Sequence, residues 1–173
     1  SLDRIFQPLN LMGEDLGSRE KILSARALFW YPAEVDVSIR PGWFYHQSQD
    51  NQVKTGDELF KIYLKSVGRN SVLLLNVPPN RKGLLADEDI HALQGFKRLI
   101  DTSFKKDLAA GARVRSSSTA AGQPVDSIID NYSGKYWLAA NNKKPAVIEL
   151  KLKEKSTFNC LELQEEITLG QRI

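Results

Sequence analysis

One stretch decides the fold class of this chain: Ser71-Val72-Leu73-Leu74-Leu75-Asn76-Val77. A nearly uninterrupted apolar run of this length is typical of a parallel strand that is covered on both faces. Pro78-Pro79 follows directly and ends the strand, because proline lacks the N–H group that a sheet ladder needs. The sequence therefore predicts a buried parallel strand over residues 71–77.

The elements upstream of that strand are a second strand and a helix. Val35, Val37 and Ile39 share one face of a period-two strand, which ends before Pro41. A capping box at a helix N-terminus is indicated by the spacing of Thr55-Gly56-Asp57-Glu58. The apolar residues that follow at helical spacing are Leu59, Ile62, Tyr63 and Val67. We expect this helix to close at Gly68.

A second helix follows downstream, so strands and helices alternate within residues 1–110. We expect Asp87 to cap this helix. Its apolar stripe consists of Ile90, Leu93, Phe96, Ile100 and Phe104. A repeating strand–helix order is the pattern of an α/β protein with right-handed crossovers.

The chain changes character near residue 110, where small and polar residues indicate a boundary. The β-like runs beyond it are 127–129, 136–138, 147–152 and 157–163. Ile148, Leu150 and Leu152 alternate with charged residues, which predicts a strand with one buried and one solvated face. We expect residues 111–173 to form part of an antiparallel β-domain, with Cys160 buried as a small apolar residue.

Composition excludes several classes of function. The 173 residues include 24 basic and 21 acidic side chains, a net charge of +3, without a basic cluster that would indicate nucleic-acid binding. No apolar run approaches the roughly 18 residues that a membrane-spanning helix needs. A single cysteine excludes an internal disulfide and a multi-cysteine zinc site.

Aromatic and charged side chains are densest in residues 30–46. Aromatic rings beside carboxylates suit a sugar site, because pyranose rings stack on aromatics while carboxylates and histidine bind hydroxyls. A packed strand pair with a surface Arg–Asp pair explains the same composition. A glycosidase needs two carboxyl groups at the scissile bond, and the spacing does not choose among Asp15, Glu20, Glu34 and Asp36. A serine nucleophile at Ser38 is disfavoured, because no Gly-x-Ser-x-Gly elbow surrounds it.

Residues 34–46, Glu-Val-Asp-Val-Ser-Ile-Arg-Pro-Gly-Trp-Phe-Tyr-His, closely resemble a signature of glycoside hydrolase family 29, the α-L-fucosidases. The likeness continues in order and spacing through 62–70, 73–80 and 83–85. It is strong over residues 13–104. A weaker likeness of 126–137 and 161–173 is to the discoidin-type β-sandwich that often follows the barrel in this family.

The resemblance implies a fold and a domain order. Residues 1–110 would be the C-terminal portion of a (β/α)-barrel catalytic domain, and residues 111–173 part of an antiparallel, discoidin-like β-sandwich. A complete barrel takes roughly 250 residues, so we expect the chain to be a C-terminal portion of an α-L-fucosidase. By the same resemblance the enzyme would be extracytoplasmic, periplasmic or secreted, with its signal peptide outside this chain.

The chemistry that the resemblance implies is retaining hydrolysis of terminal α-L-fucosyl linkages, with an aspartate nucleophile, an acid/base carboxylate and no metal or organic cofactor. The family's nucleophile lies in a Trp-Phe-Asp type motif, which this chain lacks. We therefore expect the isolated chain to be inactive. Its partners would be a fucosylated glycan and the missing N-terminal part of the enzyme, with neither nucleic acid nor membrane.

The resemblance also implies site residues. Residues 13–20 look like a shortened form of the family's Gly-Pro-Asp…Gly-Asn-Glu stretch, which favours Glu20 as the acid/base, with Glu34 as a sugar-contacting or substitute carboxylate. Trp43 would pack against the C5-methyl side of fucose. The other substrate-binding candidates are Arg40, Tyr45 and His46.

A second hypothesis is a non-catalytic carbohydrate-binding or scaffolding piece. In that case the discoidin-like tail carries the function, through 131–132, 136–137 and 141–142. A third is a remnant that needs a partner segment to fold, because unpaired strand edges aggregate.

Overall fold

The computed structural model describes residues 32–130, 134–141 and 145–166. Its elements in chain order are β1 (Glu34–Ser38), η1 (Gln47–Gln52), α2 (Gly56–Lys65), η2 (Val67–Arg69), β2 (Val72–Asn76), α3 (Asp87–Phe104), β3 (Arg113–Ser116), η3 (Val125–Ile129) and β4 (Ile148–Lys151). Asp15 and Glu20, and residues 131–132 and 142 of the tail, lie outside the described residues. The described helices are too short or too polar to span a lipid bilayer.

Strands β1 and β2 form a two-stranded parallel sheet, as the alternation of strands and helices predicts. The register pairs Glu34 with Val72 at one end and Ser38 with Asn76 at the other. Helix α2 lies between the strands in sequence, which makes a βαβ unit. The predicted α/β character of this part of the chain is therefore confirmed.

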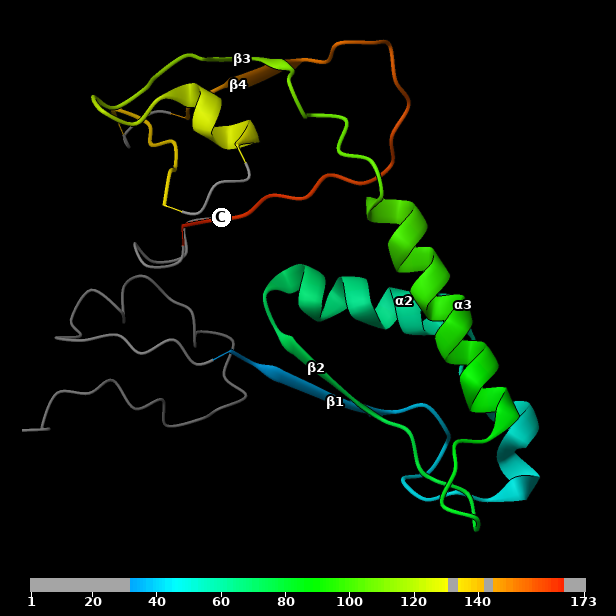
Figure 1. The fold of residues 1–173 in the computed structure, drawn as a ribbon. Coiled ribbons are helices and arrows are strands. Elements are labelled where there is room, and N and C mark those ends of the chain that lie inside the picture. The colour runs from blue at the N-terminus through cyan, green and yellow to red at the C-terminus, as the bar shows by residue number, and fades with distance from the viewer. Residues whose placement is uncertain (1–31, 131–133, 142–144, 167–173) are drawn as a thin grey trace, which may run out of the picture.

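One face of this sheet is open, so the prediction that β2 is covered on both faces is wrong for the described residues. Val72 is 45% exposed and Leu74 is 51% exposed, whereas Leu73 and Leu75 are half-buried. Side chains alternate along a strand, and α2 and α3 lie to one side of the two strands (Figure 1). The helices therefore cover one set of side chains, and the other set faces solvent.

Helix α2 begins as predicted, with a complete capping box at Thr55. The backbone N–H and the hydroxyl of Thr55 donate to Glu58, and these bonds lower the pKa of the Glu58 carboxyl. The predicted closure at Gly68 is wrong. The helix ends at Lys65, and Ser66 caps it, with its N–H and its hydroxyl both bonded to the carbonyls of the last turn. The left-handed residue that turns the chain into β2 is Asn70, with φ 63°.

Helices α2 and α3 pack closely against each other. A Cβ built on Gly56 would lie 2.7 Å from backbone atoms of α3, Gly95 C and Phe96 N. Tyr63 of α2 contacts the rings of Phe96 and Phe104 at centroid distances of 5.9 and 6.4 Å. The apolar stripe predicted for α3 therefore faces α2.

The predicted cap of α3 needs a correction. Asp87 is the first helical residue, and the N-cap is Ala86, which makes no side-chain capping bond. The first turn carries Asp87, Glu88 and Asp89, whose negative charges interact favourably with the positive end of the helix dipole. The acidic cluster therefore replaces a capping side chain, and Asp89 is completely buried.

The remaining described strands form a second sheet, in which β3 and β4 pair antiparallel. The predicted strand at 147–152 is confirmed as β4. Strand β3 was not predicted, because Arg113-Val114-Arg115-Ser116 holds a single apolar side chain, Val114, which is buried. Residues 127–129 belong to the 3-10 helix η3, and 136–138 and 157–163 form no strand, so those three strand predictions are wrong.

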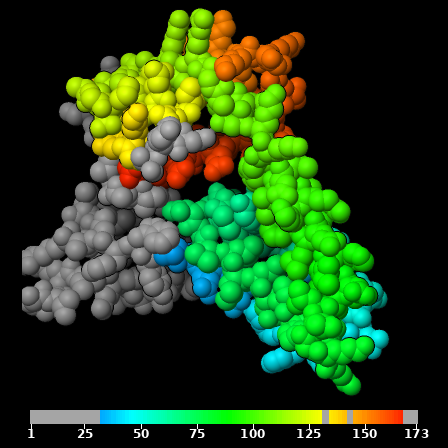
Figure 2. All heavy atoms as spheres, in the orientation of Figure 1, coloured from blue at the N-terminus to red at the C-terminus, as the bar shows by residue number. Residues whose placement is uncertain are grey.

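The tail buries less than its sequence pattern predicts. Ile148 and Leu150 of β4 remain exposed, so the predicted buried face of this strand is wrong. Cys160 is exposed rather than buried. One reason for this exposure is the path of the segment after β4 (orange to red), which leaves the sheet and runs across the molecule above α2 in the view of Figure 2. Residues without a paired strand have no opposing layer in which to bury their side chains.

Candidate functional site

The carboxyl edge of the β1–β2 sheet carries several polar and aromatic side chains of the described residues. Ser38 and Asn76 are the last residues of the two strands, and the register places them side by side. The Ile39 N–H donates to Asn76 O at 2.9 Å, which extends the pairing by one bond. The loop that follows β1 therefore leaves the sheet beside the end of β2.

Two side chains hold the start of this loop. Ser38 Oγ donates to Gly42 O at 2.7 Å. Asn76 Nδ2 donates both to Ser38 Oγ at 3.1 Å and to Trp43 O at 3.0 Å. The Ser38 hydroxyl is thus engaged in a turn, which suits a structural role rather than a nucleophile.

Arg40 holds the rest of the loop through two ion pairs. Its side chain is completely buried, and Nε donates to both carboxylate oxygens of Asp89 in α3 at 3.0 and 3.1 Å. Nη1 donates to Asp50 Oδ1 in η1 at 2.8 Å. Burial works to lower the pKa of Arg40, but the bonds and charges of Asp50 and Asp89 outweigh it and raise that pKa. The guanidinium is therefore firmly cationic.

The same guanidinium supports two of the predicted site residues. Nη1 also donates to the carbonyl of His46 at 3.3 Å. The Tyr45 ring lies over the guanidinium carbon at 4.7 Å, a cation–π distance. Nη2 of Arg40 is buried and has no hydrogen-bond partner among the described residues. Buried and paired in this way, Arg40 holds the loop together.

Exposed aromatic side chains lie on this anchored loop. Trp43 is 51% exposed and Phe44 is 78% exposed, and His46, whose backbone carbonyl accepts from Arg40, is also exposed. Large apolar side chains that stay exposed on a fixed backbone are typical of a ligand-binding surface. The structure thus brings four predicted residues into one loop: Arg40, Trp43, Tyr45 and His46.

Glu34 lies apart from that loop. It is exposed at the first position of β1, whereas Ser38 is the last. At roughly 3.3 Å per residue, about 13 Å of strand separates Glu34 from the carboxyl edge. The described residues therefore do not bring Glu34 together with Trp43.

Asp89 and Asp50 were missed by sequence reasoning. An aspartate in the first turn of a helix is already explained by the helix dipole, so nothing in the sequence indicates a partner 49 residues away. Asn76 lies within the strand predicted over residues 71–77, but its bond to Trp43 depends on the register of β1 and β2.

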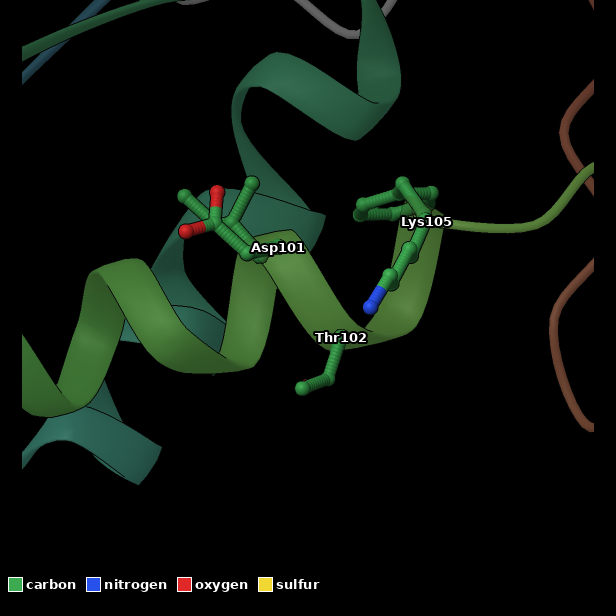
Figure 3. A pocket seen from close by; sticks show the side chains of 5 residues that line it. Asp101, Thr102 and Lys105 are labelled. Atoms are coloured by element: carbon green, nitrogen blue, oxygen red, sulfur yellow. The ribbon is translucent and has the colours of Figure 1, made fainter.

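The hollows of the described surface lie elsewhere. One of about 580 Å³ lies at the C-terminal end of α3, lined by Ile100, Asp101, Thr102, Phe104 and Lys105. Figure 3 shows that Asp101 and Thr102 leave the helix in different directions, so its polar groups do not converge. Another, of about 460 Å³, lies beside η3. Among the described side chains, no three His, Cys, Asp or Glu residues cluster as metal ligands would.

Comparison with known proteins identifies similar sequences. The family described as Alpha-L-fucosidase matches residues 11–102, more than half of the chain. Alpha-L-fucosidase 1 of Arabidopsis thaliana is 43% identical over 148 residues, which are 83% of this chain and 29% of the relative. The chain therefore spans less than a third of the length of this relative.

Solved structures show the same likeness. A Bacteroides thetaiotaomicron protein assigned to the α-L-fucosidases is 41% identical with a TM-score of 0.65, over 80% of this chain and 30% of that one. A Ruminococcus gnavus family 29 fucosidase, crystallised with fucose, is 35% identical with a TM-score of 0.61, over 69% of this chain and 24% of that one. Both values indicate a shared local fold over the matched portion.

Proposed function

Because the chain belongs to the α-L-fucosidase family, we propose that it supplies one part of the active site of a retaining α-L-fucosidase. The observation that carries this proposal is the anchored loop at the carboxyl edge of β1 and β2, with Trp43 exposed on it. Parallel βα units place their catalytic groups at this edge. We further propose that β1 and β2 are two strands of a (β/α)-barrel and that residues 111–173 belong to a discoidin-like sandwich.

The proposed roles follow the geometry. Trp43 forms the apolar wall against the C5-methyl side of fucose, and His46 and Tyr45 complete that side of the pocket. Arg40, which is buried between two carboxylates, acts on the substrate through the loop that it supports. Glu20 is the proposed acid/base, and Glu34 is the weaker candidate because of its distance from the carboxyl edge.

The substrate class is a terminal α-L-fucosyl glycan, and the compartment is periplasmic or extracellular. The aspartate nucleophile comes from outside this chain, since the chain lacks the Trp-Phe-Asp type motif. The 173-residue chain alone is therefore expected to release no 4-nitrophenol from the aryl α-L-fucoside.

A chimera tests the proposal. Residues 11–102 would replace the matching residues of the Arabidopsis relative, and hydrolysis of 4-nitrophenyl α-L-fucoside would be compared with that of the unaltered relative. Hydrolysis by the chimera is the expected result. A chimera that folds, as judged by circular dichroism, but does not hydrolyse the fucoside would contradict the proposal.

The acid/base assignment is tested in the same chimera. Glu20→Ala is expected to lower turnover by about 10²–10⁴-fold, the usual contribution of general acid–base catalysis. Azide should restore part of the lost rate, because this anion attacks the glycosyl-enzyme intermediate in place of water and needs no general base. Glu34→Ala serves as the matched variant, and rescue of Glu34→Ala but not of Glu20→Ala would reverse the two roles.

A further inference from the structure

We propose that Asn76 is a positioning residue, which fixes the backbone that presents the Trp43 indole. The inference rests on the proposed function only because that proposal assigns Trp43 to the wall of the fucose pocket. The side chain of Asn76 reaches across from the end of β2 to the loop that follows β1. It thereby joins Trp43 to a strand that is distant in sequence but paired in space.

The chemistry of the partners requires an amide at this position. Trp43 O is a carbonyl and accepts hydrogen bonds only, so the group that faces it must be a donor. The Ser38 hydroxyl donates its proton to Gly42 O and is left to accept from Asn76. Both bonds of Asn76 therefore use the NH₂ group. A carboxylate of the same shape would face Trp43 O with a repulsion and could bond to Ser38 only by taking its hydroxyl proton away from Gly42 O.

Among the described residues, the bond from Asn76 is the one hydrogen bond that the Trp43 backbone makes. The start of the turn is held separately, by the Ile39 N–H to Asn76 O, the Arg40 N–H to Ser38 Oγ and the Lys54 N–H to Ile39 O. The indole itself is half exposed, so little packing fixes it from outside. Loss of the Asn76 amide should therefore release Trp43 while the rest of the fold stays in place.

Asn80 provides a matched control in the next loop. Its side-chain oxygen accepts from the N–H groups of Lys82 and Leu84 at 2.9 and 3.1 Å. An aspartate at this position keeps both bonds, because its carboxylate is also an acceptor. The same Asn→Asp change thus removes the described bonds at position 76 and preserves them at position 80.

The experiment uses the ¹⁵N–¹H indole signals of the 173-residue chain, which has three tryptophans. Trp43→Phe identifies the Trp43 signal, and the Trp137 signal reports on whether the remainder is folded. At pH 7, Asn76→Asp is expected to shift or broaden the Trp43 signal and to leave Trp137 unchanged. Asn80→Asp is expected to leave both signals unchanged.

Acidification gives a second readout. Protonation of the introduced aspartate returns one donor, so the Trp43 signal should move back toward its original position at low pH. The ionised carboxylate would face the Trp43 carbonyl oxygen without a donor, whereas the protonated form can bond to it, so recovery should begin above the ordinary aspartate pKa of about 3.9. Ser38→Ala, which removes the other member of the pair, should displace the Trp43 signal without recovery in acid.

The outcomes are distinct. An unchanged Trp43 signal in Asn76→Asp at pH 7 overturns the proposal, as does an equal response from Asn80→Asp. If Asn76→Asp loses the Trp137 signal as well, the Ser38→Ala result decides, and an unmoved Trp43 signal there also overturns it. A selective response of Trp43 combined with an inactive chimera supports the positioning role and counts against the fucosidase proposal alone.

Discussion

At the scale of single residues, the burial of Arg40 with Asp89 organises the candidate site. Two oppositely charged groups taken out of water stabilise a fold only while both are present. Arg40 keeps Asp50 as a second partner, but Asp50 is partly exposed and lies in the short helix η1. Asp89, on the first turn of α3, is therefore the more important anchor of the loop.

We expect Asp89→Ala to destabilise the chain by about 3 kcal/mol, the lower part of the range for a broken buried pair, since Asp50 remains. Asp87→Ala is the matched control, because it removes an exposed carboxylate from the same turn and should cost about 0.3–1 kcal/mol. Urea unfolding at neutral pH measures both. Equal losses for the two variants would show that the ion pair contributes no more than the helix dipole does.

Sequence reasoning reached the site residues in part. The composition of residues 30–46 indicated a sugar site and, as the alternative, an Arg–Asp pair on the surface. The structure contains such a pair, but it is buried and joins Arg40 to Asp89. Partners so far apart in sequence are determined by the packing of α3 against the loop, which local pattern does not encode.

At the scale of elements, α2 and α3 approach each other at two glycines, Gly56 and Gly95. Alanine should affect stability differently at each of them. Gly56→Ala would place a methyl group 2.7 Å from rigid backbone atoms of α3. We expect a loss of about 1–3 kcal/mol, the usual cost of overpacking.

The control is Gly95→Ala, which would meet its nearest atom, the Gly56 Cα, at an ordinary 3.6 Å. Because alanine is the better helix former, we expect no loss and a gain of up to about 1 kcal/mol. Thermal unfolding followed by circular dichroism compares the two. A stable Gly56→Ala variant would mean that the helices separate easily.

Elements with strong local signals were predictable, and those set by pairing were not. The capping box of α2 and the apolar runs of β1 and β2 carry their own signals, and these elements were confirmed. Strand β3 carries alternating arginines and depends on β4, more than 30 residues away, to form. Residues 157–163 have a strand-like sequence, but they pair with no described strand and form no strand themselves.

At the scale of the molecule, the open face of the β1–β2 sheet is an exposed apolar surface. Val72 and Leu74 lie on it two residues apart in the same strand, and each is about half exposed. We expect the double variant Val72→Thr with Leu74→Thr to bind less of the dye ANS, while its stability changes by only about 0.5 kcal/mol.

Leu84→Thr is the control for that experiment, because Leu84 is even more exposed, at 63%, but lies in the loop after β2. It should change ANS fluorescence less than the double variant does. A large loss of stability in the double variant would instead show that this face is packed in solution.

The buried link between residues 40 and 89 also bears on protein engineering. A designer who transplants residues 39–54 to another scaffold, in order to move its aromatic surface, takes only half of the structure that shapes it. Asp89, the fully buried partner of Arg40, remains behind on α3, and the side-chain amide of Asn76 remains behind on β2. Such a graft would need to carry Asp89 and Asn76 along, so the transferable unit is a loop together with two residues from its neighbours.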